Sequence, residues 1–273
     1  MKLFKIKTPQ GYIFKVLSEL LLNIVTHIFL KIDENAIYLS MIDEQKKILV
    51  DFTLEKGNFT VYKFKSKQPL YIGINAKHLH KMLRSVKKKD SLMMFIDEKK
   101  EVLGITIIPK EHNRITNSYI KIQNVQNLNI EIPFNEKKTN PIIVPSNDFQ
   151  KLCKDMNNIG SKIKISSEGH CVKFACNANN IYSREVIFGE INEDDSDDSD
   201  DDNQYEEVFD TDVMIRIIKI AGLSSQLQIY PVNGLPLLFK SNIGQLGKIR
   251  IFVKDNNLVQ RSQNLQKSQS DSE

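Results

Sequence analysis

The chain has 273 residues, which is enough for two modest domains or one large one. A hydrophobic content of 41% and a charged content of 26% are typical of globular proteins, and no apolar run is long enough to span a membrane. The N-terminus lacks the apolar stretch of a signal peptide, and Cys153, Cys171 and Cys176 are too few for a disulfide framework. We therefore expect free thiols in a protein that is not secreted.

The net charge of +4 conceals a strong asymmetry. Residues 190–207 contain eleven Asp and Glu and no Lys or Arg, so the rest of the chain carries a net charge of +15. A run rich in Asp and Ser cannot bury itself, and we expect a disordered acidic loop. A strongly basic folded body favours an anionic partner.

The first half of the chain alternates between strand and helix patterns. Thr8 and Pro9 are typical of a helix N-cap and first helical position, and a second helix is expected over residues 75–89, with Asn75 as its N-cap. Alternating apolar residues and polar turns predict strands over residues 2–7, 24–31, 36–41, 48–55, 61–64, 71–74, 91–96, 102–108 and 114–122.

The helix expected over residues 75–89 carries two stripes. Four apolar residues have the i, i+3, i+4, i+7 spacing of one helical face: Leu79, Met82, Leu83 and Val86. Four basic residues form the second stripe: Lys77, Lys81, Arg84 and Lys88. Like charges at this spacing repel by about 0.2–0.5 kcal/mol per pair, so helix stability does not explain the basic stripe. The stripe is either a solvated outer face or a surface that meets a polyanion.

The same design recurs in helices expected over residues 146–158 and 209–222. Their basic residues are Lys151, Lys154, Arg216 and Lys219. On the first helix only Lys15 is basic and outward-facing. Three helices with one design indicate one shared, positively charged surface.

Residues 123–138 break the pattern, because scattered apolar residues among Asn and Gln lead to Pro133. We expect an extended linker that packs onto a surface. The order of elements then repeats, which indicates an internal duplication of the architecture. Strands are expected over residues 141–144, 162–166, 172–176, 181–188, 226–230, 236–243 and 248–254. The polar tail, residues 255–273, is expected to be disordered.

Signatures of catalysis are missing from the sequence. It has no glycine-rich phosphate loop, no zinc-type Cys/His spacing and no Gly-Xaa-Ser-Xaa-Gly motif. Cys171 and Cys176 with His170 could be argued as a metal site, but a buried structural thiol is the better interpretation of Cys176. We expect no catalytic residue, no metal, no cofactor and no enzymatic activity.

Several short motifs follow one another in a specific order between about Phe4 and Lys254. They are Tyr71-Ile72-Gly73-Ile74-Asn75, Val144-Pro145-Ser146, Ile159-Gly160, Val172-Lys173-Phe174, Leu235-Pro236-Leu237 and Gly244 followed by Leu246-Gly247. Together with the element order, they resemble the proliferating cell nuclear antigen (PCNA) family of DNA sliding clamps. The resemblance implies an α+β DNA-clamp fold: two similar domains, each with two helices packed on antiparallel sheets, assembled into a closed, trimeric, head-to-tail ring.

The resemblance also implies the domain boundaries. Residues 1–122 would form an N-terminal clamp domain, 123–138 an interdomain connecting linker and 139–254 a C-terminal clamp domain, with the acidic loop at about 190–207. An Asn-, Lys- and Ile-rich composition and the acidic insertion suggest a divergent member from a large DNA virus or a protist. It would be localised in the nucleus, or in a viral replication compartment in the cytoplasm if it is viral.

Three sets of functional residues follow from the resemblance. Basic residues would face duplex DNA of any sequence, the last two of them on the stripe argument alone: Lys15, Lys77, Lys81, Arg84, Lys151, Lys154, Lys219, Arg216 and Lys88. Strands matching residues 114–122 and 181–188 would join subunits through Tyr119, Ile120, Ile122, Ile181 and Val186. A pocket under the linker would receive a short motif of partner proteins: Met41, Leu49, Leu128, Ile132, Pro133, Leu235, Pro236 and Phe252. The first helix has Phe14 and Leu21 where lysines are common in the family.

The expected function is that of a homotrimeric sliding clamp, a polymerase processivity factor that encircles duplex DNA. It would tether the polymerase, the clamp loader and other replication and repair proteins. One alternative is a clamp-fold processivity factor that acts as a monomer, a dimer or a subunit of a mixed ring. Another, from a different class, is an acidic-tract chaperone for basic proteins.

Overall fold

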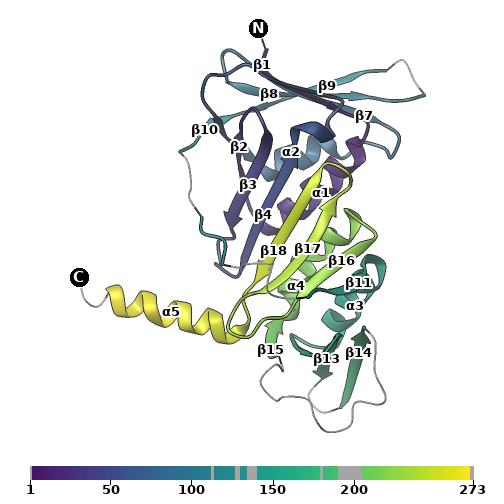
Figure 1. Ribbon diagram of the computed structural model, residues 1–273, viewed down its shortest axis with the longest axis vertical. Helices are drawn as coiled ribbons and strands as arrows, with labels where there is room; N and C mark the ends of the chain where they lie inside the picture. The colour runs from purple at the N-terminus through teal and green to yellow at the C-terminus, as the bar shows by residue number, and fades with distance from the viewer. Residues whose placement is uncertain are drawn as a thin grey trace.

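The computed structural model describes residues 2–111, 114–126, 130–133, 140–178, 181–189 and 205–270, and it consists of two similar halves (Figure 1). The N-terminal half contains helices α1 (Gly11–Ile24) and α2 (Ala76–Leu83) and the 3₁₀ helix η1 (Lys56–Asn58). Its strands are β1 (Lys2–Thr8), β2 (His27–Ile32), β3 (Ala36–Ile42), β4 (Ile48–Glu55), β5 (Val61–Phe64), β6 (Leu70–Asn75), β7 (Ser91–Asp97), β8 (Val102–Ile108), β9 (Thr116–Lys121) and β10 (Gln123–Asn124).

The C-terminal half repeats this order. Its helices are α3 (Ser146–Ile159), α4 (Thr211–Ile217), the 3₁₀ helix η4 (Ile218–Gly222) and the terminal α5 (Asn256–Ser270). Its strands are β11 (Ile142–Pro145), β12 (Lys162–Glu168), β13 (Cys171–Ala178), β14 (Tyr182–Phe188), β15 (Tyr205–Asp210), β16 (Gln226–Tyr230), β17 (Leu237–Ile243) and β18 (Gly247–Val253). No helix in the described ranges is long and apolar enough to cross a membrane.

The described strands form three antiparallel sheets. A nine-stranded sheet has the order β10-β6-β2-β3-β4-β18-β17-β16-β11, so it passes from one half to the other where β4 pairs with β18. A five-stranded sheet (β5-β1-β7-β8-β9) lies at the top of Figure 1, and a four-stranded sheet (β14-β13-β12-β15) lies at the bottom. The pairing of β4 with β18 is antiparallel, with Leu54 opposite Gly247 and Ile48 opposite Val253.

The expected duplication is confirmed by the strand order. The run β6-β2-β3-β4 of the N-terminal half has its counterpart in β15-β12-β13-β14, and β1-β7-β8-β9 has its counterpart in β11-β16-β17-β18. In this correspondence β14 is the counterpart of β4, and β9 is the counterpart of β18. β4 and β18 pair with each other within the chain. Their counterparts, β14 and β9, do not pair with each other, and each is the last strand of its own sheet.

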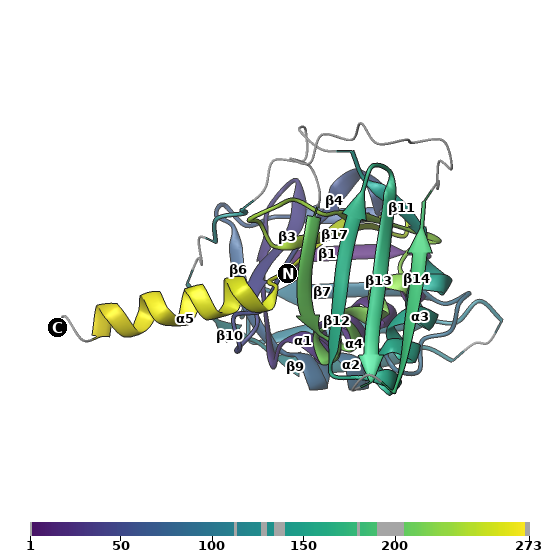
Figure 2. The same ribbon diagram turned by 90° about the horizontal axis from the view of Figure 1, so that it is seen from below.

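Helices α1, α2, α3 and α4, with η4, form one layer on a single side of the nine-stranded sheet (Figure 2). α1 contacts α2, α4 and η4, and α3 contacts α4 and η4, so the layer is continuous across the two halves. Their apolar faces are buried, as the sequence spacing predicts. Phe149 of α3, for example, is fully buried with its ring centroid 5.4 Å from that of Phe239 on β17. Each such side chain contributes roughly 1.5–3 kcal/mol of transfer free energy.

The second helix is shorter than the residue pattern predicts. α2 ends at Leu83, and residues 84–90 form a compact turn in which the Asp90 carboxylate accepts the Lys87 N–H at 2.9 Å. Val86 is buried as expected, but from this turn rather than from a helical face. The aspartate competes for the backbone N–H groups that would otherwise continue the helix.

Two further expectations about the C-terminal half are wrong. Residues 256–270 form helix α5, which projects from the body (Figures 1 and 2), instead of a disordered tail. The buried Asp255 starts this helix, because its carboxylate accepts the N–H of Leu258 at 2.8 Å. Tyr205 and Glu207 belong to strand β15 and not to the acidic loop. The remaining part of the acidic loop, residues 190–204, lies outside the described residues.

A buried ion pair fastens the two halves together. The Asp43 carboxylate, which is fully buried, accepts two backbone N–H groups of the β3–β4 turn at 2.8 and 2.7 Å. Its second oxygen accepts a hydrogen bond from Arg216 of α4 at 2.8 Å. Arg216 also donates to the carbonyl oxygens of Asn23 (3.2 Å) and Ile24 (3.1 Å) at the end of α1. One guanidinium therefore fixes the positions of α4, the end of α1 and the β3–β4 turn relative to one another.

Further ion pairs connect the same two halves: Lys47–Asp210 (2.7 Å), Arg250–Asp51 (2.6 Å) and Lys219–Glu19 (2.9 Å). Lys162 also contacts Asp210. Burial raises the pKa of Asp210, but its hydrogen bonds with Lys162 and Lys47 outweigh burial and hold the pKa below its usual value.

We expect Arg216→Met to lower the free energy of unfolding by about 3 kcal/mol, because it removes a partner from a buried carboxylate. The measurement is urea unfolding at a fixed protein concentration. Lys164→Met is the matched control, since its ion pair with Glu206 is about half exposed on both sides and is worth about 0–1 kcal/mol. An equally small loss for both variants would show that Arg216 does not hold the halves together.

Candidate nucleic-acid interface and partner-binding surfaces

The outer face of α2 is basic because its opposite face is anchored in the core. Asn75 caps the helix as expected, accepting the His78 N–H at 3.1 Å. Leu79 and Leu83 are buried. This orientation leaves three basic side chains exposed on the outer surface of the helix layer: Lys77, Lys81 and Arg84.

Helix α3 is oriented in the same way. Cys153 and Met156 are buried, while Lys151 and Lys154 are exposed. Within the described ranges, no carboxylate lies within ion-pairing distance of these two lysines or of the three basic residues of α2. The positive charge of this surface is therefore not neutralised by the described part of the chain.

The remaining lysines expected on this surface are less available. Lys15 is half-buried, with its ammonium 5.6 Å from the Tyr12 ring centroid. Lys219 pairs with Glu19 at 2.9 Å. Phe14 and Leu21 are buried in the core, so they do not occupy outward positions from which basic residues have been lost.

The two residues assigned to the DNA surface on the stripe argument alone have surroundings that helical spacing did not predict. Arg216 of α4 lies against the N-terminal half, where its guanidinium binds Asp43 and the end of α1, so it is not a free cation of the helix surface. Lys88 lies beyond the end of α2, where helical spacing no longer applies. Lys88 instead lines a cleft between the α2–β7 turn and the β8–β9 hairpin.

The two strands expected to join subunits are both open sheet edges. Apolar side chains on or beside them are unusually exposed: Ile115 (59%), Tyr119 (62%), Ile181 (82%), Tyr182 (55%) and Ile187 (45%). Edge strands with exposed apolar side chains and unpaired backbone groups are templates for pairing with another chain.

Only some of the residues predicted for the subunit interface have exposed side chains. Tyr119 and Ile181 are exposed, whereas Ile120 and Ile122 are buried in the core and Val186 packs against it. Neighbouring strand residues point to opposite faces, so a run of apolar residues cannot all face a partner. On β14 the same alternation places Ile187 on the face opposite Val186, so it could have been predicted to be exposed. Tyr182 is exposed at the start of the strand, and alternation does not predict it.

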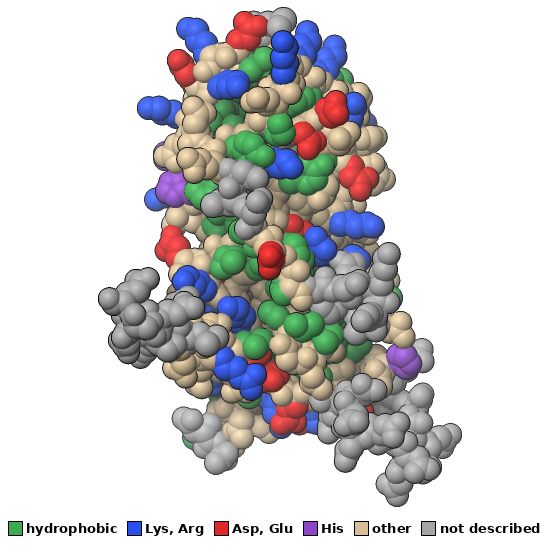
Figure 3. Space-filling model, turned by 60° about the vertical axis from the view of Figure 1, so that its left-hand side comes forward, with side chains coloured by type: hydrophobic (Ala, Val, Ile, Leu, Met, Phe, Trp, Pro, Cys, Tyr) green, Lys and Arg blue, Asp and Glu red, His purple; other side chains and the backbone are tan. Residues whose placement is uncertain are grey.

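A cleft lies on the outer face of the nine-stranded sheet, under the end of the linker. Leu49, Pro133, Pro236 and Phe252 line it, four of the eight residues predicted for the partner pocket. Ile132 packs on the same apolar cluster, which includes Phe252. Figure 3 views the molecule from the linker side, where hydrophobic side chains are exposed in patches.

The other predicted pocket residues have different positions. Met41 faces the helix layer and is buried in the core. Its neighbour Ile42, 45% exposed, lines the cleft instead, because one residue along a strand reverses the face. Leu235 is half-buried in the turn before β17, and Leu128 lies outside the described residues.

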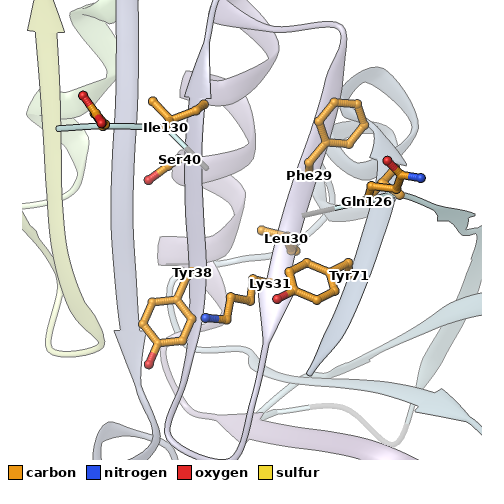
Figure 4. Close-up of a pocket in the computed structure, with 10 residues that line it drawn as sticks. Phe29, Leu30, Lys31, Tyr38, Ser40, Tyr71, Gln126 and Ile130 are labelled. Carbon is orange, nitrogen blue, oxygen red and sulfur yellow. The ribbon is translucent and has the colours of Figure 1, made fainter. Parts of the chain in front are cut away.

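A second cleft, of about 400 Å³, lies under the first part of the linker (Figure 4). Phe29, Lys31, Tyr38 and Tyr71 rise from the outer faces of β2, β3 and β6, and Ile130 approaches from the linker. Linker residues therefore line both clefts, this one with Ile130 and the other with Pro133. Such contacts are expected for a segment that packs onto a surface.

The cysteines have the character expected of structural thiols. Cys153 and Cys176 are buried, and burial raises the pKa of both thiols. The Cys176 thiol donates to the carbonyl oxygen of Lys162 at 3.1 Å. Within the described ranges, no group of three His, Cys, Asp or Glu side chains is placed to hold a metal ion.

Comparison with known proteins agrees with this arrangement along almost the whole chain. A viral protein, the probable DNA polymerase sliding clamp 1 of Paramecium bursaria Chlorella virus 1, is 28% identical over 92% of this chain and 96% of its own length. Proliferating cell nuclear antigen 2 of Plasmodium falciparum is 26% identical over 86% and 89%, respectively, and proliferating cell nuclear antigen of Chaetomium thermophilum is 22% identical over 90% and 95%.

Two family models divide the chain where the two halves meet. The proliferating cell nuclear antigen N-terminal domain matches residues 3–131, and the C-terminal domain matches residues 134–256. The two matches thus cover the two similar halves seen in the structure, one family domain for each. The chain belongs to the PCNA family of DNA sliding clamps and polymerase processivity factors.

Proposed function

We propose that three copies of this chain form a closed head-to-tail ring around duplex DNA and hold the polymerase there. The proposal rests on a difference in pairing between equivalent strands of the two halves. β4 and β18 pair within the chain, while their counterparts β14 and β9 are open edges with exposed apolar side chains.

The pairing of β14 of one subunit with β9 of the next would repeat the internal junction. It would join a four-stranded to a five-stranded sheet, as β4 and β18 join a five-stranded run (β10-β6-β2-β3-β4) to a four-stranded run (β18-β17-β16-β11) within the chain. The two surfaces differ, so the contact is heterologous, and such contacts close into a ring when the rotation allows it. The helix layer would then line the hole.

DNA binding in this ring would be independent of sequence. Lys77, Lys81, Arg84, Lys151 and Lys154 would meet phosphates, with smaller contributions from Lys15 and Lys219. Cations distributed around a hole need not all contact DNA at once, so persistence on DNA would come from topology and not from affinity.

Partner proteins would bind the cleft under the linker. Its apolar residues around Leu49 and Phe252 suit a short peptide with apolar or aromatic anchors. We assign the polymerase and the clamp loader to this surface, and the site of DNA replication, nuclear or viral, as the place of action.

The ring proposal predicts a trimer in solution, with a mass of three times 31.5 kDa by light scattering. It also predicts processive synthesis on circular primed templates, after loading, and rapid loss from linear templates with free ends. Equal persistence on both templates would contradict a topological link, and a monomer, dimer or mixed assembly would contradict the homotrimer.

Substitution of Lys77 and Lys81 by Gln should weaken binding to short linear duplex DNA and reduce the slope of log K against log salt by about 1–2. The measurement is a salt titration by fluorescence anisotropy. Lys63→Gln with Lys65→Gln is the control, because both lysines are exposed on or next to β5, an edge strand of the five-stranded sheet, and neither belongs to a helix. An unchanged slope in the α2 variant would exclude these lysines from the DNA surface.

Ile42→Ala combined with Leu49→Ala should weaken binding of a clamp-binding peptide from the cognate polymerase by roughly tenfold or more, because both residues line the cleft. Isothermal titration calorimetry provides the measurement. Ile143→Ala, at an exposed apolar position on the far edge strand β11, should leave the affinity unchanged. A similar loss in both variants would mean that the cleft is not the peptide site.

A further inference from the structure

A basic cleft of about 650 Å³ lies between the turn that follows α2 and the hairpin that joins β8 to β9. Five exposed cations line it: Lys87, Lys88, Lys89, Lys110 and Arg114. The cleft adjoins the beginning of β9, which is the open edge of the five-stranded sheet.

The carboxylates of this cleft are already engaged. Asp90 is buried and accepts the backbone N–H of Lys87 at 2.9 Å, and Glu111 pairs with Lys89 at 3.3 Å. Among the described residues, no carboxylate lies within ion-pairing distance of Lys88, Lys110 or Arg114. The cleft thus has an excess of positive charge and room for an acidic chain segment.

The chain contains one segment with matching charge. Residues 190–204 follow β14 almost directly, and nine of these fifteen residues are Asp or Glu. Within one chain, β14 and β9 lie at opposite ends of the molecule (Figure 1), so the segment is tethered far from its own cleft. A neighbouring copy would bring the two together.

The internal junction shows where the segment would be tethered. The chain that leaves β4 lies beside the residue that precedes β18, since Glu55 N–H and the Asn58 side-chain amide both donate to the carbonyl oxygen of Leu246, at 3.0 and 3.2 Å. Because β14 is the counterpart of β4 and β9 the counterpart of β18, the chain that leaves β14 would lie beside the residues preceding β9 of the next subunit. Those residues include Arg114 and Lys110.

We propose that the acidic segment of residues 190–204 docks into the basic cleft of the neighbouring subunit and forms an electrostatic clasp at each junction of the ring. The inference rests on the proposed ring. Seven extended residues span roughly 23–25 Å, so half of the segment can extend across the cleft while its ends stay at β14 and β15. Individual exposed ion pairs are weak, and the clasp depends on several acting together.

The test uses full-length variants that change charge alone. One variant replaces Asp194, Asp195, Asp197 and Asp198 by Asn. The other replaces Lys87, Lys88, Lys110 and Arg114 by Gln. Each should raise the trimer dissociation constant on the order of tenfold in 50 mM salt, with little difference from the wild type in 1 M salt. The combined variant should be no weaker than either alone, because both remove the same contact.

Lys63→Gln, Lys65→Gln and Lys67→Gln together serve as the control, because these exposed lysines lie at and just beyond β5, the opposite edge of the same sheet. This variant should dissociate like the wild type. Additive effects of the two test variants, or trimer dissociation unchanged in either, would overturn the clasp. So would a cleft variant that loses DNA affinity while its trimer stays intact, since the cleft would then serve DNA.

A wild-type chain that remains monomeric would overturn the ring, and the clasp with it. A stable wild-type trimer with unaffected variants would overturn the clasp alone. Should the neutral variants fold poorly, a charge exchange decides: Lys88→Glu and Lys110→Glu should weaken the trimer, and Asp197→Lys and Asp198→Lys should restore it.

Discussion

The backbone pairing of β4 with β18 is the constraint on which the rest of the molecule depends. It joins two duplicated halves into one nine-stranded sheet, and Arg250 and Asp51 reinforce it across the strands. Because the halves are duplicates, the same geometry remains available at β9 and β14. One such junction, between β4 and β18, forms within the chain. The equivalent strands β14 and β9 remain as unpaired edges, at which the proposed ring would form the same junction between subunits.

Helices α1 to α4 all lie on one side of this continuous sheet. Each helix buries its apolar face against the sheet, so its polar residues point away from the sheet. The lysines of α2 and α3 consequently share a surface although they are about seventy residues apart in sequence. The two halves need rigid alignment for this surface to be shared, and the buried contacts of Arg216 with Asp43 and the end of α1 supply it.

Local patterns were sufficient to predict most of the strands, the duplication and the outward lysines of α2 and α3, because each depends on periodicity within one element. They did not predict β10 or β15, which lie in the expected linker and at the end of the expected acidic loop. The errors have a different origin. Arg216 has the spacing of a surface residue, but its environment is set by α1 and the β3–β4 turn. Met41 and Ile42 differ by one position, and only the strand register decides which faces the cleft. Helix α5 was missed because its polar composition hides the capping by Asp255.

The proposed junction combines two interactions that respond differently to the solvent. Hydrogen bonds between β9 and β14, with Tyr119 and Ile187 exposed on these strands, would depend little on ionic strength. Contacts between an acidic segment and a basic cleft weaken as salt screens them. In the proposed clasp the negative charge of the acidic segment would be matched by the cations of the cleft, so the exposed lysines of α2 and α3 would stay available for phosphates. A ring built in this way can hold a basic hole and an acidic tract in the same chain without one neutralising the other.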